Sequence, residues 1–334
     1  MWTHVVVAGV VAVLLRGEEQ HPITSHCNPL PVSTRLIVYN RTPKCGSTTM
    51  VKSIKAAAKV NRVNVITSEE YWFGERKLQN VLTSILLETA GAGSRSVSAD
   101  AMPLATLLQE NGTVLQEGGG GWTKSVYHTH VLWPNLTAVG MPSNAYTFFQ
   151  LMRDPVDRFV SWHYYRLYGP RPAAALAANR ERVMAMVGMN RPPDVDEFVA
   201  SQYRNKSGCQ NGLDHNMQTR QFCGFHPDCE KVCSSKALKR AKRNLDAEYF
   251  LVGTLEELNR TVELMELLAP TFFRGLTSAV RKSKPQRVGA SNVSHGTELT
   301  RGRLRVFNSQ DEYLYRYASR QIRDQYSKCV GGGL

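Results

Sequence analysis

One short stretch near the start of the chain, residues 36–49, constrains the fold more than any other. An apolar run suited to a β-strand, Leu36–Asn40, leads into a loop with Lys44 and Gly46, after which a helical pattern begins. A strand, a short loop and a helix in this order bring backbone N–H groups together with the positive end of a helix dipole. The sequence therefore predicts an anion site, of the kind that holds the phosphate or sulfate of a nucleotide-like cofactor.

This loop differs from the phosphate-binding loop of nucleoside triphosphatases. That loop has Gly, four residues and then Gly-Lys-Ser/Thr, whereas here Lys44 precedes Gly46 and no glycine opens the loop. No apolar strand ending in an aspartate suited to Mg²⁺ follows downstream. We therefore expect Lys44 and backbone dipoles to hold the anion without a metal. A lysine in a surface turn before a helix is the structural alternative.

Strand-like and helix-like segments alternate along the chain. Strands are expected at 36–40, 63–67, 125–128, 146–152 and 249–253, and helices at about 48–60, 75–90, 155–168, 237–247, 255–268 and 309–325. Residues 91–121 are expected to be a loop with a helix near 104–109, and residues 171–235 to be irregular with short helices. The alternation predicts an α/β fold with a mostly parallel central sheet that helices flank on both faces.

The N-terminal residues indicate entry into the secretory pathway. Residues 2–15 are apolar apart from Thr3 and His4, which is short for a membrane span of about 20 residues. They lack the basic residues that usually precede the apolar core of a signal sequence. We therefore expect a signal peptide or a short signal anchor over residues 1–16, a stem over 17–34, and a single domain over 35–330.

The charge of the chain favours an anionic partner. Its net charge is +13 over 334 residues, and such a balance suits nucleic acid, an acidic polysaccharide or an anionic membrane. No basic repeat with interleaved aromatic residues and no zinc-finger spacing indicates nucleic acid. We therefore expect no nucleic-acid partner, and the polysaccharide stays open.

The cysteines lean toward an oxidising compartment. Seven are present, and four of them fall between residues 209 and 233. Zinc sites prefer close-spaced pairs of ligands, and only Cys229 and Cys233 come near that spacing, so disulfides are the favoured interpretation. Sequons for N-glycosylation agree with a secretory route; they begin at Asn111, Asn135, Asn205, Asn259 and Asn292.

A second anion site is expected at another strand end. Arg153 follows the expected strand 146–152, and Ser161 lies in the helix behind it. Ligands of open α/β sheets bind beyond the carboxyl ends of the strands, so Arg153 and the Ser161 hydroxyl could both contact an anion there. Two separated sites suit a nucleotide phosphorylated at both ends of its ribose. The structural alternative is a salt bridge from Arg153 to Asp154 or Asp157.

Two histidines, His128 and His130, lie in the segment 127–131. Alternation along a strand places both on one side. A histidine there could take a proton from a hydroxyl nucleophile, since its ordinary pKa is near neutrality. No third metal ligand stands nearby, and a purely structural role is the alternative.

Taken together, these motifs resemble the uronyl 2-O-sulfotransferase family, which includes the heparan sulfate and the chondroitin/dermatan 2-O-sulfotransferases. The resemblance runs from about residue 36 to 325, with the motifs in the family's order. They are residues 38–47 (VYNRTPKCGS), 127–131 (YHTHV), 153–161 (RDPVDRFVS), 222–224 (FCG) with Cys229, and 249–258 (YFLVGTLEEL).

Members of that family use 3′-phosphoadenosine-5′-phosphosulfate as the sulfuryl donor. The resemblance implies that its 5′-phosphosulfate lies against Lys44, Cys45, Gly46, Ser47, Thr48 and Thr49. Lys44 would also neutralise charge on the leaving phosphate oxygen. Arg153 and Ser161 would bind the 3′-phosphate, and Lys284 and Arg287 lie where a basic loop closes over the donor.

The resemblance also implies roles toward the acceptor, an acidic glycosaminoglycan. His130 matches the base that removes the proton of the uronic acid 2-hydroxyl, and His128 would assist it or contact substrate. Arg41 and Arg171 match arginines that bind the acidic sugar. The implied chemistry needs no metal and the implied location is the Golgi lumen, as a type II membrane protein or a secreted form. The heparan branch suggests a trimer.

The pattern departs from the family at some cysteines. Cys223 and Cys229 fit a small disulfide loop, and Cys209 can pair with Cys233, although the family has no cysteine expected at position 233. Cys45 is expected to be free, and the two remaining cysteines, Cys27 and Cys329, are unassigned.

Three other functions remain as alternatives. One is sulfation of another sugar hydroxyl or of a protein hydroxyl. Another is a catalytically silent, heparin-binding secretory protein. A kinase is the weakest, because of the loop differences described above. The choice between heparan and chondroitin/dermatan acceptors, and between iduronic and glucuronic acid, is left open.

Overall fold

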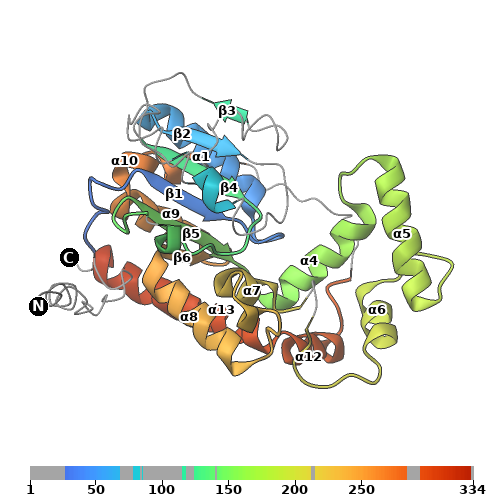
Figure 1. The fold of residues 1–334 in the computed structure, drawn as a ribbon. Coiled ribbons are helices and arrows are strands. Elements are labelled where there is room, and N and C mark those ends of the chain that lie inside the picture. Colours follow the sequence, from blue (N-terminus) through green and yellow to red (C-terminus); the bar gives the residue numbers. More distant parts are fainter. Residues whose placement is uncertain are drawn as a thin grey trace, which may run out of the picture.

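A single sheet organises the molecule. The computed structural model describes residues 27–67, 78–82, 85, 115–117, 124–139, 141–211, 215–283 and 294–331. Within these residues the sheet has the strand order β3-β2-β4-β1-β5-β6 (Figure 1). The strands are β1 (Leu36–Asn40), β2 (Asn64–Thr67), β3 (Leu115–Glu117), β4 (Ser125–Thr129), β5 (Tyr146–Met152) and β6 (Tyr249–Thr254). Only the β2–β3 pair is antiparallel, so the expected mostly parallel α/β fold is confirmed.

Helices follow most of the strands. They are α1 (Ser47–Asn61), α4 (Pro155–Tyr168), α5 (Ala173–Val187), α6 (Val195–Gln202), α7 (Met217–Cys223), α8 (Ser235–Glu248), α9 (Leu258–Leu268), α10 (Pro270–Phe273), α11 (Leu276–Lys282), α12 (Glu298–Phe307) and α13 (Ser309–Cys329), with short 3₁₀ turns at Thr137–Val139 and Pro227–Cys229. The helix expected at 155–168 is confirmed, and Asp154 caps it by accepting from the N–H groups of Val156 and Asp157.

Some elements differ from the sequence expectation. The stretch 171–235, expected to be irregular with short helices, contains the 15-residue helix α5. Its only buried residue is Val183, so it lacks the apolar stripe from which an amphipathic helix is read. Helices α11 and α12 were not expected. The expected helix 75–90 lies only partly within the described residues, and the one near 104–109 lies outside them.

The two faces of the sheet are buried against different helices. Ile37 and Phe149 belong to an apolar cluster with residues of α1, α9, α10 and α11. Val38 and Phe148, their neighbours along β1 and β5, belong to a cluster on the other face with residues of α7, α8 and α13. Complete burial of each such side chain contributes about 1.5–3 kcal/mol. Burial on both faces explains why β1 and β5 are almost continuously apolar.

A third apolar cluster lies beyond the strand ends. It joins α4, α5, α6 and α12 through side chains such as Phe159, Val183, Phe198 and Leu304. In Figure 1 these helices project to one side of the sheet, with α7 between them and α8. Because α4 begins directly after β5, its first turn connects this group of helices to the carboxyl end of the sheet.

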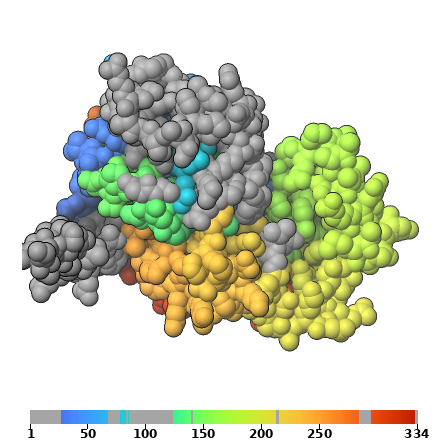
Figure 2. All heavy atoms as spheres, in the orientation of Figure 1, coloured from blue at the N-terminus to red at the C-terminus, as the bar shows by residue number. Residues whose placement is uncertain are grey.

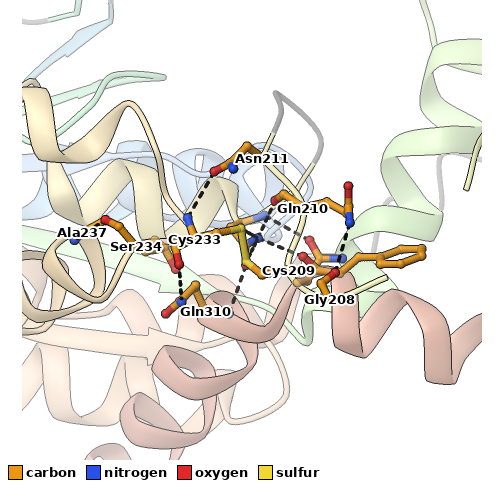
Figure 3. The surroundings of a disulfide bond; sticks show 12 residues. Gly208, Cys209, Gln210, Asn211, Cys233, Ser234, Ala237 and Gln310 are labelled. Atoms are coloured by element: carbon orange, nitrogen blue, oxygen red, sulfur yellow. Dashed lines mark hydrogen bonds between the residues drawn. A yellow bond between two sulfur atoms is a disulfide. The ribbon is translucent and has the colours of Figure 1, made fainter. Parts of the chain in front are cut away.

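Disulfides join three pairs of cysteines. The bond Cys223–Cys229 is the small loop that fits the family, and Cys209–Cys233 (Figure 3) is the further pairing expected although the family has no cysteine expected at position 233. A third, Cys27–Cys329, ties the first described residue to the last turn of α13. Cys45 is buried and unbonded. Among the described residues, no helix combines the length and the apolar composition needed to cross a membrane.

The terminal disulfide should contribute more to stability than Cys209–Cys233. The chain-entropy model assigns about 6 kcal/mol to a bond closing a loop of 302 residues and about 3.5 kcal/mol to one closing 24 residues. Replacing Cys27 and Cys329 by serine should therefore lower the free energy of unfolding more than replacing Cys209 and Cys233. Denaturant unfolding under non-reducing conditions measures both, and an equal or reversed order would contradict the prediction.

Candidate active site

The loop between β1 and α1 has the backbone of an anion site. Lys44 and Gly46 both have positive φ, 71° and 75°, and α1 starts at Ser47. The helix start has no side-chain cap and no acidic residue in its first turn. The first N–H groups of α1 therefore receive no cap from the N-cap residue, and the helix dipole adds positive potential there.

Three cations gather at this loop. The Nζ of Lys44 lies 4.1 Å from the ring centre of Tyr165, and the guanidinium carbon of Arg171 lies 4.8 Å from the same centre. Arg153 donates from Nη1 to the carbonyl oxygen of Lys44 at 3.2 Å. Burial, and then the charges of Arg153 and Arg171, lower the pKa of Lys44 to about 8. The loop thus concentrates positive charge that an anionic ligand would neutralise.

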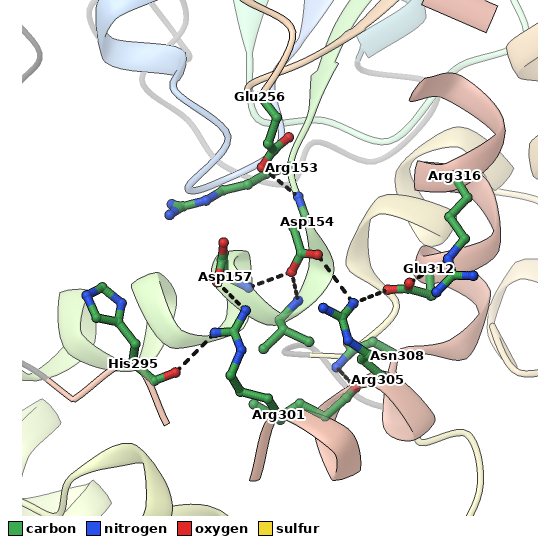
Figure 4. A network of polar contacts seen from close by, with 12 residues as sticks. Arg153, Asp154, Asp157, Glu256, His295, Arg301, Arg305, Asn308, Glu312 and Arg316 are labelled. Carbon is green, nitrogen blue, oxygen red and sulfur yellow. Dashed lines mark hydrogen bonds and ion pairs between the residues drawn. The ribbon is translucent and has the colours of Figure 1, made fainter. Parts of the chain in front are cut away.

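Arg153 does not form the salt bridge that was its structural alternative. Asp154 caps α4 and pairs with Arg305 at 3.4 Å, while Asp157 pairs with Arg301 at 2.9 Å. Figure 4 shows the guanidinium of Arg153 extending away from both aspartates. Among the described residues no carboxylate forms an ion pair with Arg153.

Ser161 lies on the part of α4 that faces the same loop. It is half-buried and precedes Tyr165 by four residues, so the two side chains share one face of the helix. Because Tyr165 contacts Lys44, the Ser161 hydroxyl is on the loop side of α4.

The two histidines occupy different environments. His130 follows the end of β4, and its Nδ1–H donates to the carbonyl oxygen of Arg41 at 2.9 Å. His128 lies within β4, is 1% exposed, and has its Nε2 at 2.9 Å from the Thr67 hydroxyl of β2. Burial, and then the charge of Arg41, lower the pKa of each imidazole to about 3. Both rings are therefore neutral near pH 7.

The tautomer of His130 follows from its partner. A carbonyl oxygen can only accept, so Nδ1 carries the hydrogen and the lone pair of the neutral ring is on Nε2. Arg41 is held in turn by β4, since its N–H donates to the carbonyl oxygen of Thr129 at 2.8 Å. The adjacent parallel strands β1 and β4 thus determine that Nε2 is the ring nitrogen of His130 with the lone pair.

Helix α7 contributes two glutamines that the sequence motifs did not reveal. Gln221 donates from Nε2 to the Arg41 carbonyl oxygen at 2.7 Å, and its Oε1 accepts from Thr42 and from Gln150 of β5. Its own carbonyl oxygen accepts from the N–H of Trp133 at 2.8 Å. One residue thereby joins the segments that follow β1 and β4 to β5.

Gln218, one turn earlier on α7, binds the backbone of Arg153, the residue that follows β5. Its Oε1 accepts from the Arg153 N–H at 2.9 Å and its Nε2 donates to the Arg153 carbonyl oxygen at 3.0 Å. The Cys45 thiol lies 3.6 Å from the same Oε1. In the sequence, the only signal for this role was that Gln218 and Gln221 are both amides and lie three positions apart.

The start of α7 is held by a buried carboxylate. Asp311 of α13 accepts from the N–H groups of Gln218 and Thr219 at 3.1 and 2.7 Å. Burial raises the pKa of Asp311, although the charge of Arg158 opposes that shift. The negative charge of this carboxylate interacts favourably with the positive end of the α7 dipole. The same contacts connect α13 to the site.

The two cations expected in the basic loop, Lys284 and Arg287, lie outside the described residues. The described chain stops at Ser283, whose Oγ is 3.1 Å from Ser53 Oγ of α1, and resumes at Ser294, which donates to Asp196 of α6. Among the described residues, no group of three or more His, Cys, Asp or Glu is placed to share a metal ion.

Comparison with known proteins gives the family of the chain. A family model described as "Sulfotransferase family" matches residues 33–318. The chain belongs to the sulfotransferase family. The likeness to a solved retinol dehydratase with androsterone and inactive cofactor PAP has a TM-score of 0.20 at 13% identity, over 89% of this chain and 82% of that one, and carries no argument.

Curated relatives of this sulfotransferase carry the names of uronyl and heparan sulfate 2-sulfotransferases. The "Uronyl 2-sulfotransferase homolog pip" of Drosophila melanogaster is 30% identical over 62% of this chain and 42% of its own length. The human "Uronyl 2-sulfotransferase" is 25% identical over 83% and 58%. "Heparan sulfate 2-O-sulfotransferase 1" of Xenopus laevis is 34% identical over 47% and 41%. The chain spans about half the length of these relatives.

The close approach of α7 to the segment after β4 should depend on Gly224. Its φ is +88°, and a Cβ there would lie 2.4 Å from the carbonyl oxygen of Trp133. Gly224→Ala should therefore cost about 2–4 kcal/mol of stability, because backbone would have to move as well as adopt a strained φ. Thermal or denaturant unfolding measures the loss.

Gly188→Ala is the matched control for this substitution. Gly188 also has positive φ, +70°, but a Cβ there meets nothing within 4 Å. Gly188→Ala should therefore lower the free energy of unfolding by only about 1–2 kcal/mol, the conformational cost of a positive φ. Equal losses in the two variants would show that the contact with Trp133 does not matter.

Proposed function

We propose that this sulfotransferase transfers a sulfuryl group from 3′-phosphoadenosine-5′-phosphosulfate to the 2-hydroxyl of uronic acid residues in a glycosaminoglycan. The observation that carries the proposal is the convergence of two features at the carboxyl ends of β1 and β4. One is the group of cations around Lys44, whose pKa is lowered to about 8 by burial and then by the charges of Arg153 and Arg171. The other is a neutral His130 whose Nδ1–H is held by Arg41.

The residues around the loop fit a nucleotide with two phosphate groups. The uncapped start of α1 offers N–H donors for a 5′-phosphosulfate along Lys44, Cys45, Gly46, Ser47, Thr48 and Thr49. Arg153, with which no carboxylate of the described residues forms an ion pair, and the Ser161 hydroxyl are suited to a 3′-phosphate. When bound, this nucleotide supplies the sulfuryl group. Lys284 and Arg287 are proposed as further contacts from the basic loop.

His130 is proposed as the general base. Its Nε2 lone pair can accept the proton of an acceptor hydroxyl, while the Arg41 carbonyl oxygen holds the ring through Nδ1–H. That hydrogen bond would favour the imidazolium after proton transfer. The pKa of about 3 is that of the protein alone, and the negative charges of an acidic sugar and a nucleotide would raise it. The contact of His128 with Thr67 supports a positioning role in the interior of the sheet.

Lys44 is proposed to stabilise the negative charge that develops on the leaving phosphate oxygen. A preorganised cation at such a point contributes strongly to charge stabilisation in a partly buried site. The contact with the Tyr165 ring holds the ammonium group in place.

Arg41 and Arg171 are proposed to bind the carboxylate or sulfate groups of the acceptor. A polyanionic acceptor also suits the net charge of +13. The names of the relatives support uronic acid in heparan or related chains as the acceptor. The three disulfides support an oxidising location such as the Golgi lumen.

Replacing His130 by alanine tests the proposed base. Sulfate transfer to desulfated heparan, chondroitin or dermatan should fall by about 10²–10⁴-fold, as expected for loss of a general base. Binding of adenosine 3′,5′-bisphosphate should stay within about threefold, because the nucleotide contacts lie elsewhere. His226→Ala, an exposed histidine whose pairing is with Asp228, is the control. Transfer by His130→Ala within tenfold of the unmodified protein would exclude the base role.

The pKa of Lys44 makes nucleotide binding pH-dependent. Below pH 8 the ammonium group is charged, and above it the group becomes neutral. The affinity for adenosine 3′,5′-bisphosphate should therefore fall as pH rises through about 8, approaching tenfold per pH unit from this group. Lys44→Arg should remove this alkaline decline, because a guanidinium stays charged. Titration calorimetry from pH 7 to 10 measures both, and a flat profile for the unmodified protein would contradict the assignment.

A further inference from the structure

The exposed side of α8 carries a stripe of cations. Lys236, Lys239 and Arg243 are all exposed and follow one another at helical spacings of three and four residues, so they lie along one face. Lys231 is exposed in the turn before the helix, and Arg240 adds a half-buried cation. The opposite side of α8 packs on the sheet through Ala237, Ala241 and Leu245. We call Lys231, Lys236, Lys239 and Arg243 the α8 stripe; α8 is seen in gold in Figure 2.

Salt bridges are absent from the α8 stripe in the part of the chain that the structure describes. Among the described residues none of its four members forms an ion pair. Three exposed arginines on α9 and α13 do form ion pairs, Arg260 and Arg323 with Glu257 and Arg316 with Glu312. The carboxylates of α8 itself are Asp246, which binds Lys242, and the largely buried Glu248, whose raised pKa is opposed by Arg243.

The stripe begins close to the candidate active site. The disulfide Cys209–Cys233 lies just before α8 (Figure 3). The Nδ2 of Asn216 lies 3.2 Å from Cys209 Sγ. Gln310 donates to the Cys233 carbonyl oxygen from the same side. Asn216 is two residues before Gln218, which binds the backbone of Arg153.

From that end the stripe leads away from the site. Helix α8 passes directly into β6, whose amino end is at the edge of the sheet opposite the active-site loops. Its 14 residues span about 21 Å. A long polymer that left the active site at this end would therefore reach a line of cations that form no ion pair with the described residues.

We propose that the α8 stripe is a second binding surface for the acidic polysaccharide, outside the active site. It would hold a stretch of the acceptor chain remote from the reacting sugar through sulfate and carboxylate groups. The acceptor class rests on the proposed function. Because exposed charge pairs are individually weak, the surface acts by several contacts at once and favours long acceptors over short ones.

Charge reversal tests this surface. In the variant Lys236→Glu, Lys239→Glu and Arg243→Glu, KM for long desulfated heparan chains should rise about tenfold or more at low salt, since several screened contacts become repulsive. For the shortest oligosaccharide that the protein sulfates, kcat and KM should stay within about twofold. The difference between long and short acceptors should shrink as salt is added.

A matched control has the same change of net charge elsewhere. Lys59, Arg274 and Lys328 are exposed on α1, after α10 and at the end of α13, and their reversal to Glu should leave the preference for long chains intact. Thermal unfolding checks that both triple variants fold. If the reversal variant does not fold, the Gln substitutions at the same three α8 positions replace it, with an expected increase of about threefold.

The outcomes separate this surface from the proposed function. Direct titration with long heparin requires no transfer, so weaker binding by the α8 variant would support the surface even if no glycan were sulfated, which would overturn the proposed function alone. Normal transfer with the same long-chain KM in both triple variants would overturn the surface alone. A loss of binding only to vesicles containing anionic phospholipid would also overturn it, because the surface would then serve a membrane.

Discussion

The arrangement of the site depends on hydrogen bonds from two amide side chains to backbone at the strand ends. Where β1, β4 and β5 stop, their peptide groups no longer have sheet partners, and a buried peptide group without a partner is costly. Gln221 contacts the carbonyl oxygen of Arg41, and Gln218 contacts both backbone groups of Arg153. These contacts place His130, which binds the Arg41 carbonyl oxygen, and Arg153 relative to one turn of α7. Asp311 fixes that helix turn from α13.

The same geometry keeps like charges close together. Lys44 and Arg153 belong to different strand–loop units, and Arg171 follows α4, yet the charges of both arginines depress the pKa of Lys44. The free energy gained by burying the two apolar clusters of the sheet offsets the mutual repulsion of these cations. An anion bound between these cations would be attracted by all of them and would reduce their mutual repulsion. Repulsion among fixed cations therefore favours the binding of an anionic ligand.

Local sequence signals predicted the parts of the fold that repeat a simple period. Strand 146–152 and helix 155–168 appear with the expected bounds because an apolar run, an N-cap and a proline at the first helical turn all agree. For residues 171–235 only short helices were expected, because the exposed alanines of α5 carry no periodic pattern that would predict its full length. The motif residues Lys44, Arg153 and His130 could be selected from loops and strand ends, but Gln218, Gln221 and Asp311 could not. Their roles arise from contacts between segments 65 to 180 residues apart.

The bond between Cys27 and Cys329 has a mechanical consequence. Tension applied through the residues before Cys27 would not be borne by the short run to β1 alone, because part of it passes across the sulfur bridge into α13. That helix is anchored along the sheet by Leu314, Ala318 and Ile322. A tether at this end of the chain therefore loads the first strand and its loop less than it would without the bond.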